Sequence, residues 1–174
     1  MRALLLIDHG SRRSEANEML QCMAALVQRM AGPSVVVRHA HMELAGPSIE
    51  EGVASCIAAG ATEVIAFPYM LSPGRHSTSD IPAMVAAAAK AYPTVRVSVT
   101  PAFGIEAELG AVILRRAGIA IATPVNTATD CDCWHPGGQI GTCGDACPAR
   151  HQRATGATAG GGVSARPASH QVRR

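Results

Sequence analysis

The chain has 174 residues, of which 48% are hydrophobic and only 3% are aromatic. This length gives one packed domain with a real core and leaves too little sequence for two domains of ordinary size. Because aromatic residues are scarce, the core must be built from Ala, Val, Ile, Leu and Met, as in buried parallel strands covered by Ala-rich helices. The composition therefore favours an α/β fold.

The formal net charge of +2 hides an uneven distribution of charge along the chain. Residues 150–174 contain five arginines and no acidic residue, so residues 1–149 contain ten basic and thirteen acidic residues. The five arginines lack the clustering and the interleaved aromatic residues of a nucleic-acid-binding segment. We therefore expect no nucleic-acid partner, and we expect residues 150–174 to form a disordered basic tail.

An apolar run at residues 3–7 ends at Asp8. It is too short for the core of a signal peptide or for a membrane span. We therefore expect a cytoplasmic protein that does not associate with a membrane. Two of the six cysteines, Cys22 and Cys56, fall in helical patterns and are predicted to lie in the core.

Four short runs of β-branched and aliphatic residues predict strands, and segments with helical periodicity separate them. The strands are expected at residues 3–7, 35–38, 64–67 and 95–99. Right-handed crossovers between parallel strands place helices on both faces of a sheet. We therefore expect a single doubly wound, flavodoxin-like domain with a parallel sheet.

Helices are expected over residues 14–31, from near residue 47 to residue 60, from Asp80 to about residue 91, and over residues 105–117. One face of the first helix is apolar and is expected to pack on the sheet; it contains Leu20, Met23, Val27 and Met30. The carboxylate of Asp80 is expected to cap the third helix. Residues 119–122 are expected to add a short strand.

Ligands of an open parallel sheet bind at the carboxyl ends of its strands, and three of these ends are followed by histidine-containing loops. The loops bring together His9, His41, Glu43 and His76. Imidazole and carboxylate groups bind divalent first-row metal ions, and they also transfer protons near neutral pH. The sequence therefore predicts a metal-handling or proton-transferring site at this edge.

Arginines near the same loops favour an anionic ligand. Arg12, Arg13 and Arg75 are fork-shaped donors for carboxylate or phosphate groups, so we expect a ligand with several carboxylates. We expect these arginines, with Ser11 and His41, to bind the substrate. Two simpler interpretations stay open, because His41 could order its own turn and Arg75 could form a surface ion pair.

Three motifs occur in order: LLIDHGSRR at residues 5–13, AHMELAGPSI at residues 40–49 and SPGRHSTSDIP at residues 72–82. They resemble motifs of the short sirohydrochlorin chelatase (CbiX/SirB) family over about residues 1–118. The resemblance implies a class II chelatase that uses no ATP and inserts Fe²⁺ for sirohaem or Co²⁺ for cobalamin. By position, His9 and His76 match the two active-site histidines of the family, and Glu43 matches their acidic partner.

These three side chains suit that reaction as catalytic groups and as metal ligands. Metallation removes the pyrrolic protons while the metal exchanges water for ring nitrogens, so the site needs imidazoles that hold metal and accept protons. The Asp-His-Gly opening and the Ser-Pro-Gly-Arg-His-Ser-Thr segment resemble the iron-inserting members more, so we favour iron over cobalt. Long members contain two such domains around a cleft, so the resemblance to short members implies a homodimer.

Four further cysteines form a C-x-C-x₉-C-x₃-C pattern: Cys131, Cys133, Cys143 and Cys147. We assign residues 1–123 to the chelatase domain and residues 124–149 to a Cys-rich C-terminal extension. An Fe–S cluster, Zn²⁺ or transient metal delivery, and redox thiols all stay open for the extension. Cys-rich extensions of some similar short chelatases favour the cluster.

Two other functions compete with a chelatase. A metal or tetrapyrrole carrier would bind without turnover. A histidine-phosphatase-like enzyme would have a phosphorylated histidine after the first strand, but such enzymes have Arg-His-Gly there and this chain has Asp8 before His9. The missing arginine removes a phosphate clamp beside the nucleophile.

Overall fold

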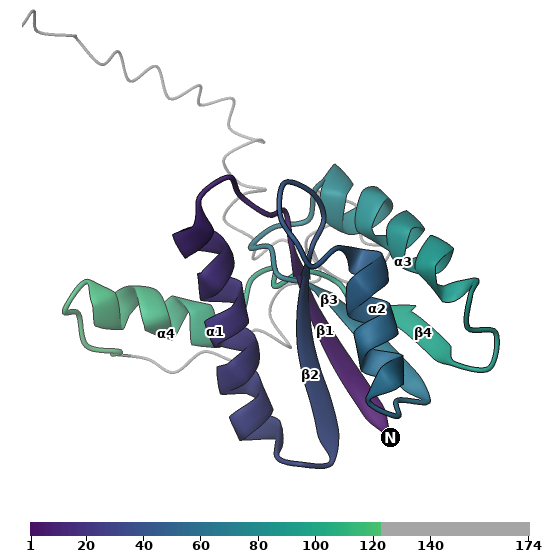
Figure 1. Ribbon diagram of the computed structural model, residues 1–174. Coiled ribbons are helices and arrows are strands. Elements are labelled where there is room, and N and C mark those ends of the chain that lie inside the picture. The colour runs from purple at the N-terminus through teal and green to yellow at the C-terminus, as the bar shows by residue number, and fades with distance from the viewer. Residues whose placement is uncertain (123–174) are drawn as a thin grey trace, which may run out of the picture.

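The computed structural model describes residues 1–122 (Figure 1). Strands and helices alternate in the order β1 (Arg2–Asp8), α1 (Ser14–Ala31), β2 (Val35–His41), α2 (Ile49–Ala58), β3 (Glu63–Pro68), η1 (His76–Asp80), α3 (Ile81–Ala89), β4 (Arg96–Val99) and α4 (Ala107–Arg116). The strands form a parallel sheet in the order β2-β1-β3-β4. The expected doubly wound, flavodoxin-like α/β fold is therefore confirmed.

Side chains that alternate along β1 build a core on each face of the sheet. Leu5 and Ile7 face the α2 and α3 side and lie in one buried cluster with Val53 of α2. Leu6 points to the opposite face and packs with Leu20 of α1. Alternation of this kind is the period-2 pattern of a strand buried on both faces. Helices on both faces therefore cover the central strand, as Figure 1 shows.

The strand register brings the carboxyl ends of three strands to the same edge. Asp8 at the end of β1 pairs with His41 at the end of β2. On the other side of β1, Ile7 pairs with Pro68 at the end of β3. The loops that follow β1, β2 and β3 therefore begin side by side, as the topology predicted.

The bounds of α1 match the predicted residues 14–31, but the prediction of its buried face is partly wrong. Leu20 is buried, whereas Met30 is 78% exposed. Cys22 is exposed, which contradicts the expectation that it lies in the core, while Cys56 is buried as predicted. Burial raises the pKa of the Cys56 thiol to about 11, so this thiol is held in its unreactive protonated form.

Two predictions near the ends of helices are also wrong. Asp80 makes no capping hydrogen bond with its side chain, because η1, a single π-helical turn, directly precedes α3. Residues 119–122 form no strand after α4. Within residues 1–122, no helix combines the length and the apolar character needed to cross a membrane. The predictions for residues 124–149 and 150–174 lie outside the described residues.

Candidate active site

Three side chains from three different loops meet at the carboxyl edge of the sheet. Nε2 of His9 lies 2.9 Å from Oε1 of Glu43. The ring of His9 also meets the ring of His76 edge to face, with centroids 5.1 Å apart. The His9, Glu43 and His76 side chains are 42%, 53% and 49% exposed, so a ligand can reach them from solvent. The structure thus brings together the three residues that the sequence predicted as catalytic.

Backbone hydrogen bonds extend the β1–β2 pairing into the loops and hold His9 near Glu43. The N–H of Met42 donates to the carbonyl of Asp8 over 2.8 Å, and the N–H of Glu43 donates to the carbonyl of His9 over 3.1 Å. Gly10 has φ +83° and lies so close to Glu43 that a β-carbon there would overlap the Glu43 carbonyl oxygen. Only glycine therefore allows the two loops to approach this closely.

The Asp8 carboxylate contacts both the loop after β1 and the end of β2. Its Oδ1 lies 2.6 Å from Nδ1 of His41 and accepts a 2.9 Å hydrogen bond from the N–H of Gly10. His41 is 1% exposed, so the prediction that it contacts substrate does not fit its position. The register pairs its Cα with that of Asp8, and its ring turns inward to that carboxylate. His41 therefore stabilises the loops, which is the structural alternative that the sequence left open.

His39 lies next to His41, with ring centroids 5.8 Å apart. Burial lowers the pKa of the His39 imidazole and the charge of His41 lowers it further, while Asp8 raises it. His39 therefore favours its neutral form, which agrees with a residue that supports the strand rather than one that binds an anionic ligand.

His76 follows the third loop and is the first residue of η1. Its Nδ1 lies 2.9 Å from Oδ2 of Asp80, and Nε of Arg75 lies 3.5 Å from Oδ1 of the same carboxylate. Ser77 is buried and its hydroxyl donates to the carbonyl of Gly74 over 3.1 Å, which closes the turn before the helix. His76 is thus held between a closed turn and a carboxylate.

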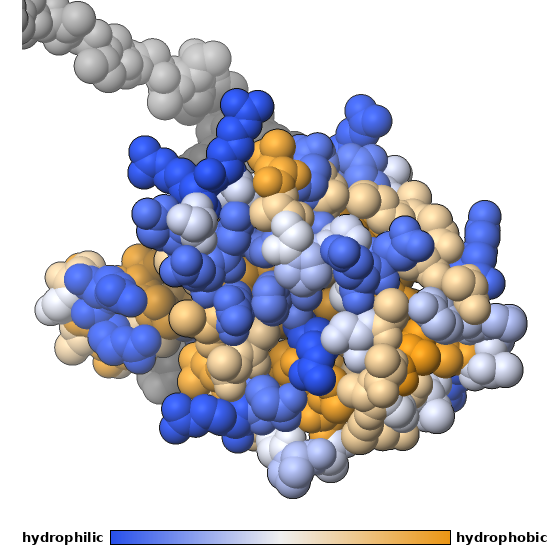
Figure 2. Space-filling view, viewed as in Figure 1, coloured by the Kyte–Doolittle hydropathy of each residue, from blue (hydrophilic) through white to orange (hydrophobic). Residues whose placement is uncertain are grey.

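The predicted substrate-binding arginines all lie near this edge, with different contacts. Arg12 and Arg13 are exposed, and Figure 2 shows hydrophilic side chains gathered over the amino end of α1. Arg75 is 85% exposed and forms the ion pair with Asp80 that the simpler interpretation anticipated. Ser11 is fixed by Asn17, whose amide donates to the Ser11 carbonyl over 2.8 Å and accepts from its N–H over 2.9 Å.

Sequence reasoning missed the supporting roles of Asp8, Asn17 and Asp80. Asp80 could have been found from its spacing, because His76 and Asp80 are four residues apart and residues so spaced meet on one turn of helix. Asp8 and His41 are 33 residues apart and meet only because of the register between β1 and β2. That pairing needs the exact alignment of the two strands, which hydrophobic pattern alone does not give.

Chemically, the edge combines an open pair of imidazoles with two carboxylates. Among residues 1–122, no group of three or more His, Cys, Asp or Glu side chains is arranged so that it could hold a metal ion. An open arrangement suits a metal ion that is passed on as a substrate, because a closed shell of protein ligands would retain it. Imidazoles placed in this way are able to bind a divalent metal ion and to accept protons.

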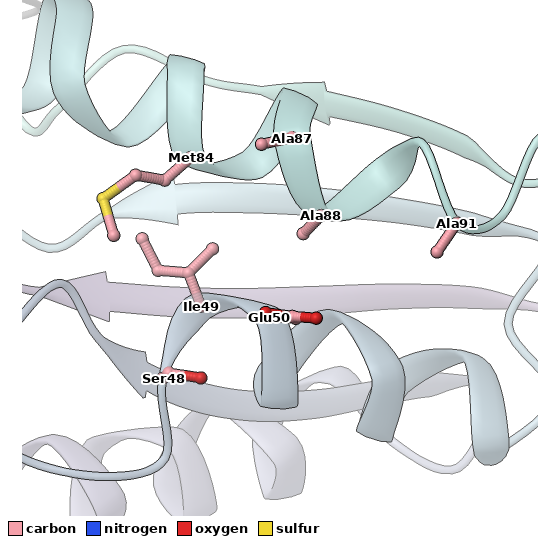
Figure 3. Close-up of a pocket in the computed structure, with 7 residues that line it drawn as sticks. All are labelled: Ser48, Ile49, Glu50, Met84, Ala87, Ala88 and Ala91. Atoms are coloured by element: carbon pink, nitrogen blue, oxygen red, sulfur yellow. The ribbon is translucent and has the colours of Figure 1, made fainter.

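A groove of about 340 Å³ lies elsewhere, between α2 and α3. Figure 3 shows Ile49 and Met84 facing one another across it, with Glu50 as its one acidic lining residue. Its other lining residues are Ser48, Ala87, Ala88 and Ala91. It contains none of the predicted catalytic side chains, so the chemistry belongs to the strand edge and not to this groove.

Comparison with known proteins agrees with this geometry. The family model for CbiX matches residues 3–120, which include all three loops. The chain belongs to the CbiX family. Membership explains why the three motifs occur in this order, and residues 123–174 lie outside both the matched and the described residues.

Relatives of this CbiX-family chain include proteins named for either metal. It is 40% identical over 101 residues to the chloroplastic sirohydrochlorin ferrochelatase of Arabidopsis thaliana, covering 58% of this chain and 44% of that protein. It is 29% identical over 127 residues to the sirohydrochlorin cobaltochelatase of Priestia megaterium, covering 71% of this chain and 41% of that protein. The chain therefore spans less than half the length of these relatives.

A solved chelatase shares the fold. The crystal structure of the sirohydrochlorin chelatase SirB from Bacillus subtilis subspecies spizizenii in complex with cobalt gives a TM-score of 0.62 at 30% identity. The match covers 67% of this chain and 50% of that chain. The described part of this chain thus corresponds to half of the solved protein.

Proposed function

We propose that this chain is a sirohydrochlorin chelatase that inserts a divalent metal ion into the tetrapyrrole without ATP. The observation that carries the proposal is the meeting of His9, Glu43 and His76 at the carboxyl edge of the sheet. Membership of the CbiX family and similarity to proteins named as sirohydrochlorin chelatases support it.

In this proposal the imidazoles of His9 and His76, the two histidines at the rim formed by the carboxyl edge of the sheet, both bind the metal ion and accept the displaced protons. His76 and His9 hold the metal ion as it loses water, and an imidazole takes each proton that leaves a pyrrole nitrogen. Glu43 lies 2.9 Å from Nε2 of His9, so a proton accepted by His9 is shared with this carboxylate. Arg12, Arg13 and Arg75 bind the carboxylates at the edge of the macrocycle.

Iron is the metal that we propose, with cobalt as the alternative. The sequence similarity to the ferrochelatase of Arabidopsis thaliana, at 40% identity, supports iron. The 29% identical cobaltochelatase supports cobalt. A set of imidazoles and carboxylates accepts several first-row divalent ions, so these ligands alone do not select one of them.

We also propose that two copies of the chain form a homodimer that completes the substrate site. The described residues match half of the solved SirB chain, so a second unit is needed to reach that size. A closed dimer supplies one by repeating the same unit about a twofold axis. The cytoplasmic location and a metal or Fe–S site on Cys131, Cys133, Cys143 and Cys147 stay predictions, and those cysteines lie outside the described residues.

The test is anaerobic conversion of sirohydrochlorin with Fe²⁺, Co²⁺ or Ni²⁺, followed by absorbance. Wild type should turn over many times, and His9→Ala and His76→Ala should each lower kcat/KM by at least about 100-fold. His39→Gln is the matched control, because it removes an imidazole that lies on β2 and outside this cluster. Rates that are unchanged in both alanine variants contradict the mechanism, and binding of the tetrapyrrole without turnover indicates a carrier instead.

A further inference from the structure

The hydrogen bond between His76 and Asp80 determines which ring nitrogen of His76 carries the proton. Nδ1 lies 2.9 Å from Oδ2 of Asp80. An ionised carboxylate only accepts hydrogen bonds, so Nδ1 must be the donor. In the neutral ring the other nitrogen, Nε2, then keeps its lone pair and is able to bind a metal ion.

The carboxylate of Asp80 contacts His76 and does not cap helix α3. An aspartate at the start of a helix ordinarily accepts from a free N–H of the first turn. Asp80 makes no such bond, and its own backbone is already helical. Its side chain instead contacts Nδ1 of His76 and, at 3.5 Å, Nε of Arg75.

The π-helical turn places these two residues together. The N–H of Ile81 donates to the carbonyl of His76, five residues earlier, which defines the π-turn. Single π-turns are rare and occur often at functional sites. This π-turn begins with His76 and ends with Asp80, so it contains both residues of the hydrogen-bonded pair.

The two rim histidines are not equivalent. His9 has an acceptor beside each ring nitrogen, since Nε2 lies 2.9 Å from Glu43 and Nδ1 lies 3.3 Å from the carbonyl of Gly10. For His76, the described residues provide a hydrogen-bond partner for Nδ1 and none for Nε2. Nε2 of His76 is therefore the ring nitrogen that a ligand can reach without displacing a hydrogen bond made by the described residues.

We propose that Asp80 is a positioning residue that holds His76 in the Nδ1–H tautomer, so that Nε2 receives the incoming divalent metal ion. The inference rests on the proposed chelatase function. A carboxylate behind a metal-binding imidazole fixes its orientation and increases its basicity, and loss of such a partner costs about 10- to 100-fold in metal affinity or activity. Through His76, Asp80 therefore acts on capture of the metal ion. Its contact with Arg75 is long, at 3.5 Å, and Arg75 is 85% exposed, so this contact contributes little to binding of the tetrapyrrole.

The kinetic test separates the two substrates. Asp80→Ala should raise the KM for Fe²⁺ or Co²⁺ by about 10- to 100-fold while the KM for sirohydrochlorin stays within about twofold. Asp80→Asn, whose amide oxygen is still able to accept from Nδ1, should lose less. Ser79→Ala changes an exposed residue of the same turn and should match wild type. An unchanged metal KM in Asp80→Ala, or an equal rise in both KM values, overturns the inference.

The tautomer itself can be measured without turnover. In the full chain labelled with ¹⁵N-histidine, long-range ¹H–¹⁵N correlation spectra distinguish a protonated Nδ1 from a protonated Nε2. His76, assigned by comparison with His76→Ala, should be the Nδ1–H form in wild type and shift toward the Nε2–H form in Asp80→Ala. An Nε2–H form in wild type overturns the inference even if the chain is a chelatase. If wild type shows no metallation at all, the proposed function fails, while this measurement still decides the tautomer.

Discussion

Gly10 is the residue at which backbone conformation and the candidate site are most directly linked. Its φ of +83° and its contact with the Glu43 carbonyl allow His9 and Glu43 to approach. Its N–H also donates to Asp8, which holds His41. Gly10 therefore connects the exposed His9–Glu43 pair to the Asp8–His41 pair, in which only His41 is buried.

We predict that Gly10→Ala separates the His9 loop from the Glu43 loop. Left-handed backbone costs about 1–2 kcal/mol for a residue with a side chain, and the added methyl group also overlaps the Glu43 carbonyl. Displacement of a catalytic group by about 1 Å can lower the rate about 100-fold. We therefore expect kcat/KM for metallation to fall by about that factor, measured with the anaerobic absorbance assay.

Gly32→Ala is the matched control for that prediction. Gly32 has a similar φ of +73°, but no atom lies within 4 Å of the position of its β-carbon. This variant therefore has the backbone strain without the clash and lies at the end of α1, away from the rim. Its ψ of −170° puts Gly32 in a region that is almost restricted to glycine, so this variant should lose about 1–3 kcal/mol of stability and keep its activity. Equal loss of activity in both variants means that strain alone, and not the close contact with Glu43, explains the effect.

At the scale of the elements, the start of α2 stabilises the end of β2. Ser48 and Glu51 form a capping box, in which the Ser48 hydroxyl accepts from the Glu51 N–H and the Glu51 carboxylate accepts from the Ser48 N–H. The residue before the box, Pro47, accepts a 2.8 Å hydrogen bond from the N–H of His41. The cap therefore holds both a helix and the strand end that leads to Glu43.

We predict that Ser48→Ala lowers the free energy of unfolding by about 1 kcal/mol, the usual cost of removing a serine N-cap. Urea denaturation should show a lower midpoint with an unchanged m-value. Glu50→Ala is the control, because Glu50 is exposed in the same first turn but does not belong to the box. Glu50→Ala should lose less, and an equal loss in both variants contradicts a specific contribution of the Ser48–Glu51 box, to which Glu50 does not belong.

Over the whole molecule, the sequence was sufficient to predict β1 to β4 and the cluster of His9, Glu43 and His76, but it wrongly added a strand at residues 119–122. Hydrophobic runs separated by helical periodicity predict the alternating elements, and parallel topology then places His9, Glu43 and His76 at one edge. The sequence did not predict that His41 turns inward, because that depends on its neighbour across the β1–β2 register. The sequence also did not predict the π-turn in which Asp80 contacts His76 instead of capping α3, because the turn depends on the backbone path of the loop before it.

The apolar face of α4 is the feature that bears on assembly. Helix α4 is amphipathic, but none of its residues is buried. Its apolar side chains Val112 and Ile113 are 38% and 67% exposed. Figure 1 shows α4 standing apart from the sheet, beyond α1. An amphipathic helix gains stability by burying its apolar face against another element. We expect the second copy of the chain in the proposed homodimer to supply such a surface.

We predict that Ile113→Glu weakens the homodimer, because burial of an isoleucine side chain contributes about 1.5–3 kcal/mol and 1.4 kcal/mol corresponds to about tenfold in affinity. Sedimentation equilibrium of the full chain over a range of concentrations should show a dimer for wild type and a dissociation constant at least about tenfold higher for the variant. Met84→Glu introduces the same charge on α3, where Met84 is 38% exposed, and should leave the dimer intact. A monomeric wild type contradicts the homodimer, whereas a dimer that resists Ile113→Glu uses a surface other than α4.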